Sequence, residues 1–277
     1  MCYHISFEIK LESIANYFPD VVIDDQPELE FSPSPYINGF SHLPHRVMVQ
    51  STKDNKRHFP SMIWGILPSY VRNMDEAKKF WNGYKDDSGK WHTGYTTLNA
   101  MGEEMFEKKL YKDAALTRRC IVFVDGFYES YHYYPVGKKG QRLKTPVTYP
   151  FHIRLKDNQY PFTMFAGIWS PWKQTEVDKD TGEVITRTIP CFSIVTTVAN
   201  ELMAKIHNSK KRMPTILTRD LADEWLQADI SEQRIKEIAM NQYPSASMEA
   251  FNVPKDFQKL EYPKQVQIYP ELEREFC

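Results

Sequence analysis

Short apolar stretches separated by polar segments recur along this chain, and four of them predict β-strands. Each is rich in β-branched and aromatic residues and is bounded by polar or glycine-containing turns, as buried or half-buried strands are. The predicted strands are 120–130 (CIVFVDGFYES), 148–155 (TYPFHIRL), 160–172 (YPFTMFAGIWSPW) and 189–199 (IPCFSIVTTVA). Polar segments at 137–145 and 173–188 are expected to connect them as hairpins.

Helices and further strands are expected around this strand-rich region. Apolar spacing and capping residues (Thr218 or Asp220, and Ser231) predict helices at 9–18, 102–114, 199–207, 217–228 and 231–240. The other segments predict a Pro-rich loop leading into a strand (31–50), a buried strand or turn (61–71), a short helix with a long polar excursion (74–100) and a last strand (245–254).

The order of these elements indicates the fold class. Strands follow one another without a regular alternation with helices, which is typical of α+β proteins. We therefore expect an α+β fold with a mostly antiparallel, barrel-like β core and flanking helices. Residues 1–277 are expected to form a single domain, with a core at about 2–228 and a C-terminal strand and tail at 229–277.

Composition narrows the class of protein. The 277 residues are 42% hydrophobic and 26% charged, which suits a globular protein with a full core. No apolar run approaches the roughly 20 residues of a membrane span, and the N-terminus lacks the pattern of a signal peptide. Four widely spaced cysteines form no CxxC pair, so no zinc site or disulfide framework is predicted. We expect a cytoplasmic monomer without metal, cofactor or membrane contact.

Charge is balanced overall but uneven along the chain. The net charge of −1 gives no global basic field of the kind that announces a nucleic-acid-binding protein. Two stretches are nevertheless strongly basic, GKKGQRLK at 137–144 and KIHNSKKR at 205–212. They form either a basic strip on a neutral protein or two solvated loops, and the sequence leaves both open.

The second residue, Cys2, is the first candidate for chemistry. Removal of Met1 would leave one residue that carries both an α-amine and a thiol. Their reference pKa values, about 7.7–8.0 and about 8.5, make both groups available near neutral pH. Such a 1,2-aminothiol condenses with an aldehyde to an imine, and the thiol then closes a five-membered thiazolidine. The alternative is a small buried hydrophobic residue on the first strand.

Three further residues have side chains suited to acid–base or hydrogen-bonding roles. Glu129 follows aromatic residues at a strand end, where desolvation raises a carboxyl pKa; an edge carboxylate in water is the alternative. Asn99 either donates its amide to a reacting oxygen or caps the helix expected after it. His207 is either an acid or base near pH 7 or a surface residue at a helix C-terminus.

Taken in chain order, these residues lie in a series of short motifs. The series is MC at the start, WGILPSY, LNA…E, RRCIVFVDGFYE, FAGIW, SIVTTVAN and H…RMPTIL. It closely resembles the SOS response-associated peptidase family from Met1 to about Trp225, and the DGFYE and H…RMP stretches are the most specific parts. The resemblance implies a single domain with an antiparallel β core and flanking helices.

The resemblance also implies an activity. Family members bind single-stranded DNA and junctions of single- and double-stranded DNA, and they crosslink to abasic sites through the N-terminal cysteine, which protects the lesion in the DNA damage response. Cys2 matches that nucleophile. The implied roles are sugar-ring opening for His207, proton transfer for Glu129, and hydrogen bonds to the sugar oxygen or the Cys2 backbone for Asn99. The same residues are expected to support removal of Met1, and the DNA-bound protein is expected at the nucleoid.

DNA binding through phosphate contacts and base stacking is implied as well. Arg212 matches the arginine of the RMP motif and is a candidate phosphate contact. Trp64 and Pro68 match the family's WGLIP stretch and are candidates to stack on bases or wedge between them, with core packing as the alternative for Trp64. Further candidate phosphate contacts are Lys210, Lys211, Arg118 and Arg119.

Three features depart from the family pattern. Met101 stands where the family has an arginine, which removes one expected phosphate contact. Residues 209–211 (SKK) lengthen the loop before Arg212; they either compensate with two positive charges or move His207 out of register. The excursion at 82–96 has no predicted role.

Two other functions remain open on the sequence alone. An amidohydrolase would use the Cys2 amine as the base for its own thiol, turning over a small amide with the basic loops incidental. A non-catalytic DNA-binding module would keep Cys2 as a structural residue. Three outcomes distinguish these functions. A stable adduct indicates the crosslinking protein, and turnover of an amide indicates the amidohydrolase. DNA binding that needs neither Cys2 nor Glu129 indicates the non-catalytic module.

Overall fold

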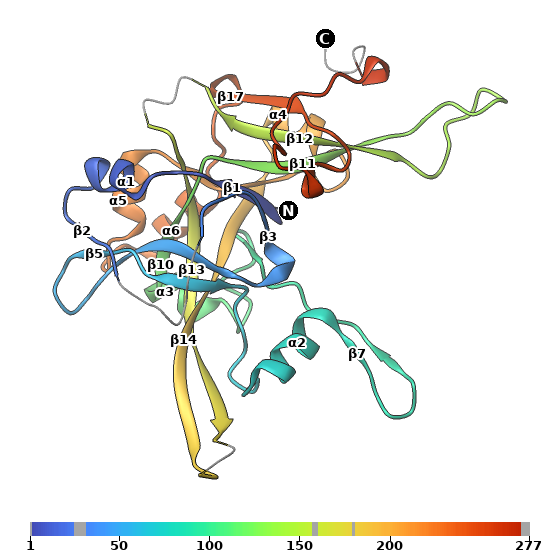
Figure 1. Ribbon diagram of the computed structural model, residues 1–277. Coiled ribbons are helices and arrows are strands. Elements are labelled where there is room, and N and C mark those ends of the chain that lie inside the picture. The colour runs from blue at the N-terminus through green and yellow to red at the C-terminus, as the bar shows by residue number, and fades with distance from the viewer. Residues whose placement is uncertain (1, 25–31, 157–159, 179–180, 273–277) are drawn as a thin grey trace.

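The computed structural model describes residues 2–24, 32–156, 160–178 and 181–272, and a ring of five strands lies at its centre (Figure 1). The strands are β4 (Pro44–Gln50), β6 (Ser61–Trp64), β10 (Arg119–Val124), β13 (Thr163–Val177) and β14 (Val184–Val198). They are ordered β10–β13–β14–β6–β4, and β4 pairs again with β10, so the ring closes into a barrel. An odd ring cannot be antiparallel at every step, and here β6 and β14 run parallel.

A second sheet, antiparallel throughout, lies beside the barrel. Its order is β17 (Met248–Asn252), β12 (Val147–Leu155), β11 (Gly126–Tyr133), β1 (His4–Phe7) and β3 (Ser34–Asn38). Only Asp125 separates β10 from β11, so the chain passes from the barrel into the second sheet at this residue. One cluster of buried apolar side chains, which includes Cys2, Phe127 and Phe192, draws on both sheets.

Short helices and strands complete the molecule. The helices are α1 (Leu11–Tyr17), α2 (Met74–Asn82), α3 (Lys112–Thr117), α4 (Glu201–Ile206), α5 (Arg219–Trp225) and α6 (Glu232–Ala239). The remaining strands are β2 (Val21–Val22), β5 (Arg57–His58), β7 (Tyr84–Lys85), β8 (Trp91–His92), β9 (Asn99–Met101), β15 (Arg212–Pro214) and β16 (Ile216–Leu217). Strands β9 and β15 both pair with β14, which brings residues from distant parts of the chain to one end of the barrel.

The architecture confirms the predicted α+β class with a mostly antiparallel, barrel-like core. One predicted element differs. The helix expected over 102–114 is a run of turns, and α3 begins only at Lys112. Met105 and Phe106 are buried, and a Cβ on Gly102 would lie 2.8 Å from the Ala239 carbonyl oxygen, so packing against α6 outweighs helix propensity. The stretch 120–130, predicted to be strand-like with a turn at Asp125–Gly126, forms two strands, β10 and β11, which divide at Asp125 and lie in different sheets.

Candidate functional site

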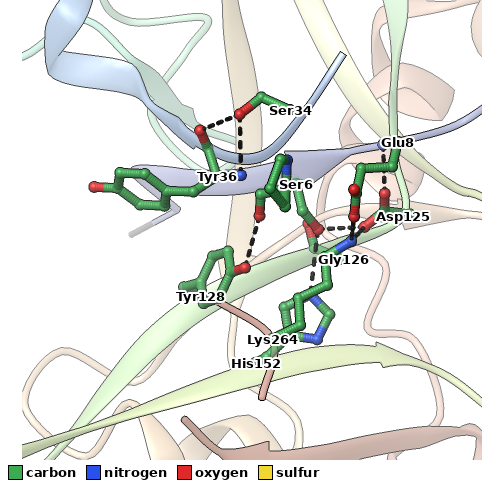
Figure 2. Close-up of polar contacts among 10 residues, drawn as sticks. Ser6, Glu8, Ser34, Tyr36, Asp125, Gly126, Tyr128, His152 and Lys264 are labelled. Atoms are coloured by element: carbon green, nitrogen blue, oxygen red, sulfur yellow. Dashed lines mark hydrogen bonds and ion pairs between the residues drawn. The ribbon is translucent and has the colours of Figure 1, made fainter. Parts of the chain in front are cut away.

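Polar contacts around Asp125 fix the N-terminal strand in place (Figure 2). The Asp125 carboxylate accepts hydrogen bonds from the Ser6 hydroxyl and from the Glu8 backbone N–H, the latter at 2.6 Å. The Lys264 ammonium group contacts the carboxylates of both Asp125 and Glu8 at 2.7 Å. These contacts, of which those of Ser6 and Lys264 with Asp125 are partly buried, join β1 to the point where the chain changes sheets. They therefore set where the residues before β1 lie.

The pairing register carries Cys2 toward Glu129. Strands β1 and β11 are antiparallel, with His4 opposite Tyr128 and Ile5 opposite Phe127. The chain before His4 therefore runs alongside the residues that follow Tyr128. Cys2 has no exposed surface and packs in the same apolar cluster as Phe127. The N-terminal cysteine is thus held inside the protein beside β11.

Each position of the DGFYE motif has a local role, and Gly126 is required for close packing. A Cβ at this position would lie 2.4 Å from two ring atoms of His152 and 2.8 Å from the Ile153 carbonyl oxygen. Phe127 packs edge-on against Phe165 in the apolar cluster. The structural residues of the motif hold the strand from which its carboxylate projects.

Gly126→Ala is expected to destabilise the fold by about 1–3 kcal/mol, the usual cost of overpacking a tight interior. The Ile153 carbonyl belongs to the paired strand β12 and cannot move independently of the sheet. Urea denaturation measures the change in free energy of unfolding. Gly137→Ala is the control, because the nearest atom to its Cβ is the flexible end of exposed Leu143, at 2.9 Å. Equal stability of the two variants would contradict this packing account.

Strand alternation places Glu129 on the same face as Phe127, inside the molecule. Tyr128 points to the other face, where its hydroxyl donates to the Pro35 carbonyl oxygen at 2.7 Å. The Glu129 carboxylate lies 3.8 Å from Nε2 of His207, and both side chains are only 9% exposed. The structure therefore brings together two residues that lie 78 positions apart in the sequence.

The loop after α4 holds His207 in this position. Asn200 caps α4 by accepting from the Met203 N–H, and His207 follows the last turn. Asn208 then bonds the backbone of His132 on β11 twice, accepting from its N–H at 3.0 Å and donating to its carbonyl at 2.9 Å. Because Asn208 fastens the loop to the strand of Glu129, the SKK residues do not move His207 out of register.

Asn99 contacts Cys2 directly. Its side-chain N–H donates to the Cys2 carbonyl oxygen at 2.9 Å, and its backbone pairs with Ile194 of β14. The alternative of a helix cap is wrong, because Asn99 begins strand β9 and turns follow it. Its side-chain oxygen is buried without a hydrogen-bond partner among the described residues. That oxygen is an acceptor positioned beside the N-terminal cysteine.

Burial shifts the ionisation of the site. It raises the pKa of the Glu129 carboxyl to about 7 and lowers the pKa of His207 to about 4. Burial, followed by the charge of Glu129, raises the pKa of the Cys2 thiol well above its usual value. At neutral pH the imidazole is uncharged, the thiol is protonated, and the carboxyl titrates.

The tautomer of His207 follows from its second contact. Nδ1 lies 3.0 Å from the Arg212 carbonyl oxygen, which can only accept, so Nδ1 carries the proton. Nε2 then faces Glu129 with a lone pair. Glu129 is therefore the group that exchanges protons near pH 7, and His207 is its acceptor partner. Together they can remove a proton from the amine or thiol of Cys2 and return it.

The candidate base-stacking residues differ in exposure. Trp64 is buried, stacks on Phe192 and donates its indole N–H to the Leu98 carbonyl oxygen at 2.9 Å. Leu98 directly precedes Asn99, so Trp64 supports the site from the core side. Pro68 is partly exposed, and Tyr70 beyond it is 69% exposed.

The basic candidates also separate into two groups. Lys210 and Lys211 are exposed on the loop after His207. Arg119 is buried and donates to backbone carbonyl oxygens at the ends of α3 and α5, and Arg118 donates to the Trp169 carbonyl oxygen at 3.3 Å. Arg212 forms a two-pronged ion pair with Glu103 at 2.8 Å. These three arginines have structural partners in this form of the chain.

Sequence reasoning missed residues that act by positioning. The sequence presents Asn208 only as part of a lengthened loop and Asp125 only as part of a turn. Lys264 lies in the tail, beyond the motif series. The one available signal was the adjacency of Asn208 to His207 and of Asp125 to the strand of Glu129. Their contacts depend on tertiary pairing that a single sequence does not show.

Two absences concern the residues that the structure describes. Within them, no group of three or more His, Cys, Asp or Glu side chains is arranged to hold a metal ion. None of the helices found there is long and apolar enough to cross a membrane.

Known proteins share both the sequence pattern and the fold. The chain matches the profile of the SOS response associated peptidase (SRAP) family over residues 1–260. Abasic site processing protein YoqW of Bacillus subtilis is 26% identical over 228 residues, 82% of this chain and 81% of that protein. Abasic site processing protein HMCES of Xenopus tropicalis is 28% identical over 214 residues, 73% of this chain and 55% of that longer protein.

A solved structure of a protein from Bacteroides thetaiotaomicron superposes with a TM-score of 0.70 at 26% identity. The superposition covers 96% of this chain and 100% of the other. Abasic site processing protein YedK of Escherichia coli is 25% identical over 225 residues, 81% of this chain and 80% of that protein. The family match extends past α6 and β17, well beyond half of the chain. The chain belongs to the SOS response-associated peptidase (SRAP) family.

Proposed function

We propose that this protein captures abasic sites in single-stranded DNA by a covalent bond to Cys2, after Met1 has been removed. The observation that carries the proposal is the grouping of Asn99, Glu129 and His207 around the N-terminal cysteine. The names of the relatives, abasic site processing proteins, support the substrate. The adduct shields the lesion in damaged DNA from strand cleavage.

The chemistry follows from the aminothiol. An abasic deoxyribose is in equilibrium with a ring-opened aldehyde. The Cys2 amine adds to the C1′ carbon, and loss of water gives an imine. The thiol sulfur then adds to the imine carbon while its proton passes to the nitrogen, closing a thiazolidine. Aldehyde and aminothiol are consumed, one water is released, and no oxidant or cofactor is needed.

Proton transfer is assigned to Glu129. Its pKa, raised by burial to about 7, suits it to accept a proton from the amine or thiol and to protonate the departing water. His207 is a base or acceptor at this pH, because burial lowers its pKa to about 4. Its part in ring opening is therefore to accept the sugar hydroxyl proton. Asn99 holds the Cys2 carbonyl and so fixes the amine.

Removal of Met1 is part of the proposal. Cys2 has no exposed surface, so an aldehyde reaches it only after the site opens. The same acid–base pair can activate the Cys2 thiol against the preceding peptide bond, which supports self-processing as the peptidase activity of this chain. DNA is expected to contact Pro68, Lys210 and Lys211, candidates whose side chains are partly or fully exposed.

The decisive test compares one chain before and after its N-terminus is freed. The protein is expressed with a cleavable tag directly before Cys2 and incubated with single-stranded DNA that carries one abasic site. We expect a heat-stable adduct, seen by denaturing electrophoresis and intact mass, only after cleavage. Its mass should equal protein plus DNA minus one water. An adduct of equal yield from the uncleaved chain would overturn the proposal, and turnover of a small amide without adduct would favour an amidohydrolase.

A further inference from the structure

A basic hairpin extends from the strand that carries Glu129. Residues 134–146, here called the basic arm, connect β11 to β12 and project from the body of the molecule (Figure 1). The arm contains no Asp or Glu, and its four cations lie within seven positions: Lys138, Lys139, Arg142 and Lys144. The proposed chemistry at Cys2 uses none of them.

The arm is an ordered ribbon. Val136 and Arg142 form a β-bridge, the Gly137 N–H donates to the Gln141 carbonyl at 2.7 Å, and the Leu143 N–H donates to the Pro135 carbonyl at 2.8 Å. A turn closes the tip through a 2.9 Å hydrogen bond from Gly140 to Gly137, with Gly140 at φ +78°. A glycine in this conformation after a tight turn is typical of three-residue hairpin loops. The turn therefore displays two lysines at a defined place.

The charges of the arm are available to a partner. All four cations are exposed, and none forms an ion pair within the described part of the chain. At the base of the arm, Asn208 fastens the loop of Lys210 and Lys211 to His132 of β11. Burial raises the pKa of Glu129, and the charge of Lys210 on this loop is one of the smaller effects that oppose the rise. On a chain of net charge −1, this is a local concentration of positive charge.

We propose that the basic arm binds the phosphate backbone of a DNA duplex that flanks the abasic site. The inference rests on the proposed function and adds to it the direction in which the duplex extends from the site at Cys2. From Glu129 to Lys139 is ten residues, which at about 3.3 Å each is about 33 Å of ribbon. Duplex DNA rises about 3.4 Å per base pair. The tip therefore contacts phosphates roughly ten base pairs from the lesion.

The test uses two variants of equal charge. The arm variant carries Lys138→Gln, Lys139→Gln, Arg142→Gln and Lys144→Gln. The control variant carries Lys53→Gln, Lys56→Gln, Lys173→Gln and Arg187→Gln, four exposed cations on other hairpins. Binding is measured by fluorescence anisotropy with junction DNA whose lesion is a tetrahydrofuran, which lacks the aldehyde. The duplex beside the lesion is about 5 or about 15 base pairs long. The shorter duplex ends before it reaches the tip of the arm, and the longer one extends past it.

We expect the arm variant to bind the long-duplex probe at least roughly tenfold more weakly than the wild type, and to match it on the short one. Because each phosphate contact contributes about 0.9 to the slope of log K against log salt, loss of the four contacts should lower the slope by about 3.6. The control variant should match the wild type on both probes. Equal loss on both lengths, equal loss in the control variant, or tighter binding of the arm to anionic vesicles than to DNA would overturn the inference.

The chemistry at Cys2 is followed separately. Adduct formation with natural abasic DNA on a short single strand should be unchanged in the arm variant, because that substrate does not reach the arm. If the wild type formed no adduct with this substrate, the proposed function would be wrong. If the adduct formed normally but the slope of log K against log salt were the same in the arm and control variants, only the role of the arm would be wrong.

Discussion

Cys2→Ala is expected to abolish the heat-stable adduct, lowering its yield by roughly a thousandfold or more, as loss of a nucleophile does. The Cys2→Ala variant, freed of its first residue, keeps an N-terminal amine and can still form an imine with the aldehyde. It lacks the sulfur that closes the ring, so the imine hydrolyses when the sample is heated. In the proposed reaction the amine forms the first bond to the sugar, and the thiol makes the adduct stable to heat.

Borohydride-type reduction separates these two roles. With cyanoborohydride present during the reaction, the Cys2→Ala variant should give a trapped secondary-amine adduct, whereas the wild type needs no reductant to give its adduct. Cys120→Ala is the matched control, since Cys120 is equally buried in the same apolar cluster as Cys2 and has no assigned role. A full yield of heat-stable adduct from Cys2→Ala without reductant would exclude the thiazolidine.

The fold was predictable where local pattern and tertiary environment agree. The strands around Cys120, Ile153, Phe165 and Ile194 combine β-branched and aromatic residues with turn signals, and all lie in the sheets as expected. The sequence predicted a barrel-like core but not which strands pair to close it. Closure depends on the pairing of β4 with β10 and of β6 with β14, which join segments far apart in the sequence. No periodicity encodes such pairings.

The residues of the candidate site could be named from the sequence because they lie in motifs, but the surroundings of their side chains could not. The sequence could not show that Trp64 supports Leu98 from the core, or that Arg212 is occupied by Glu103. Met101, which stands where the family has an arginine, precedes Glu103 by two positions. Arginine, lysine and tryptophan are ambiguous in a single sequence, because each is found both in buried hydrogen-bonded positions and at DNA-binding surfaces.

Glu129→Gln is expected to make the protein more stable and much less active. Loss of the acid–base role that we propose for Glu129 should lower the rate of adduct formation by about 10²–10⁴-fold. The folded protein, however, carries a cost for burying this carboxylate. Burial raises the pKa from 4.5 to about 7, and that difference corresponds to about 3 kcal/mol when the group is ionised.

The cost of burying Glu129 depends on pH, and it lowers the stability of the wild type as the pH rises. Below pH 4.5 the carboxyl is protonated in both the folded and the unfolded chain, so the wild type bears no cost. Between 4.5 and about 7 the unfolded chain ionises first, and the stability of the wild type falls until the folded carboxyl ionises as well. His207 stays uncharged through most of this window, because its pKa is lowered by burial to about 4, and supplies no compensating charge.

Glu129→Gln should therefore unfold at a higher temperature than the wild type at pH 8, by roughly 6–12 °C for about 3 kcal/mol in a chain of this size, and the difference should vanish below pH 4.5. Differential scanning calorimetry measures the shift, and gel assays of adduct formation at the same pH values measure the rate. Glu107→Gln, an exposed carboxylate, is the matched control and should change neither. The wild-type rate should rise between pH 6 and 7.5, and the variant should lack this rise until the amine itself deprotonates near pH 8. A shift in unfolding temperature that is the same at every pH would mean that Glu129 is not the group that titrates, and the acid–base assignment would pass to His207.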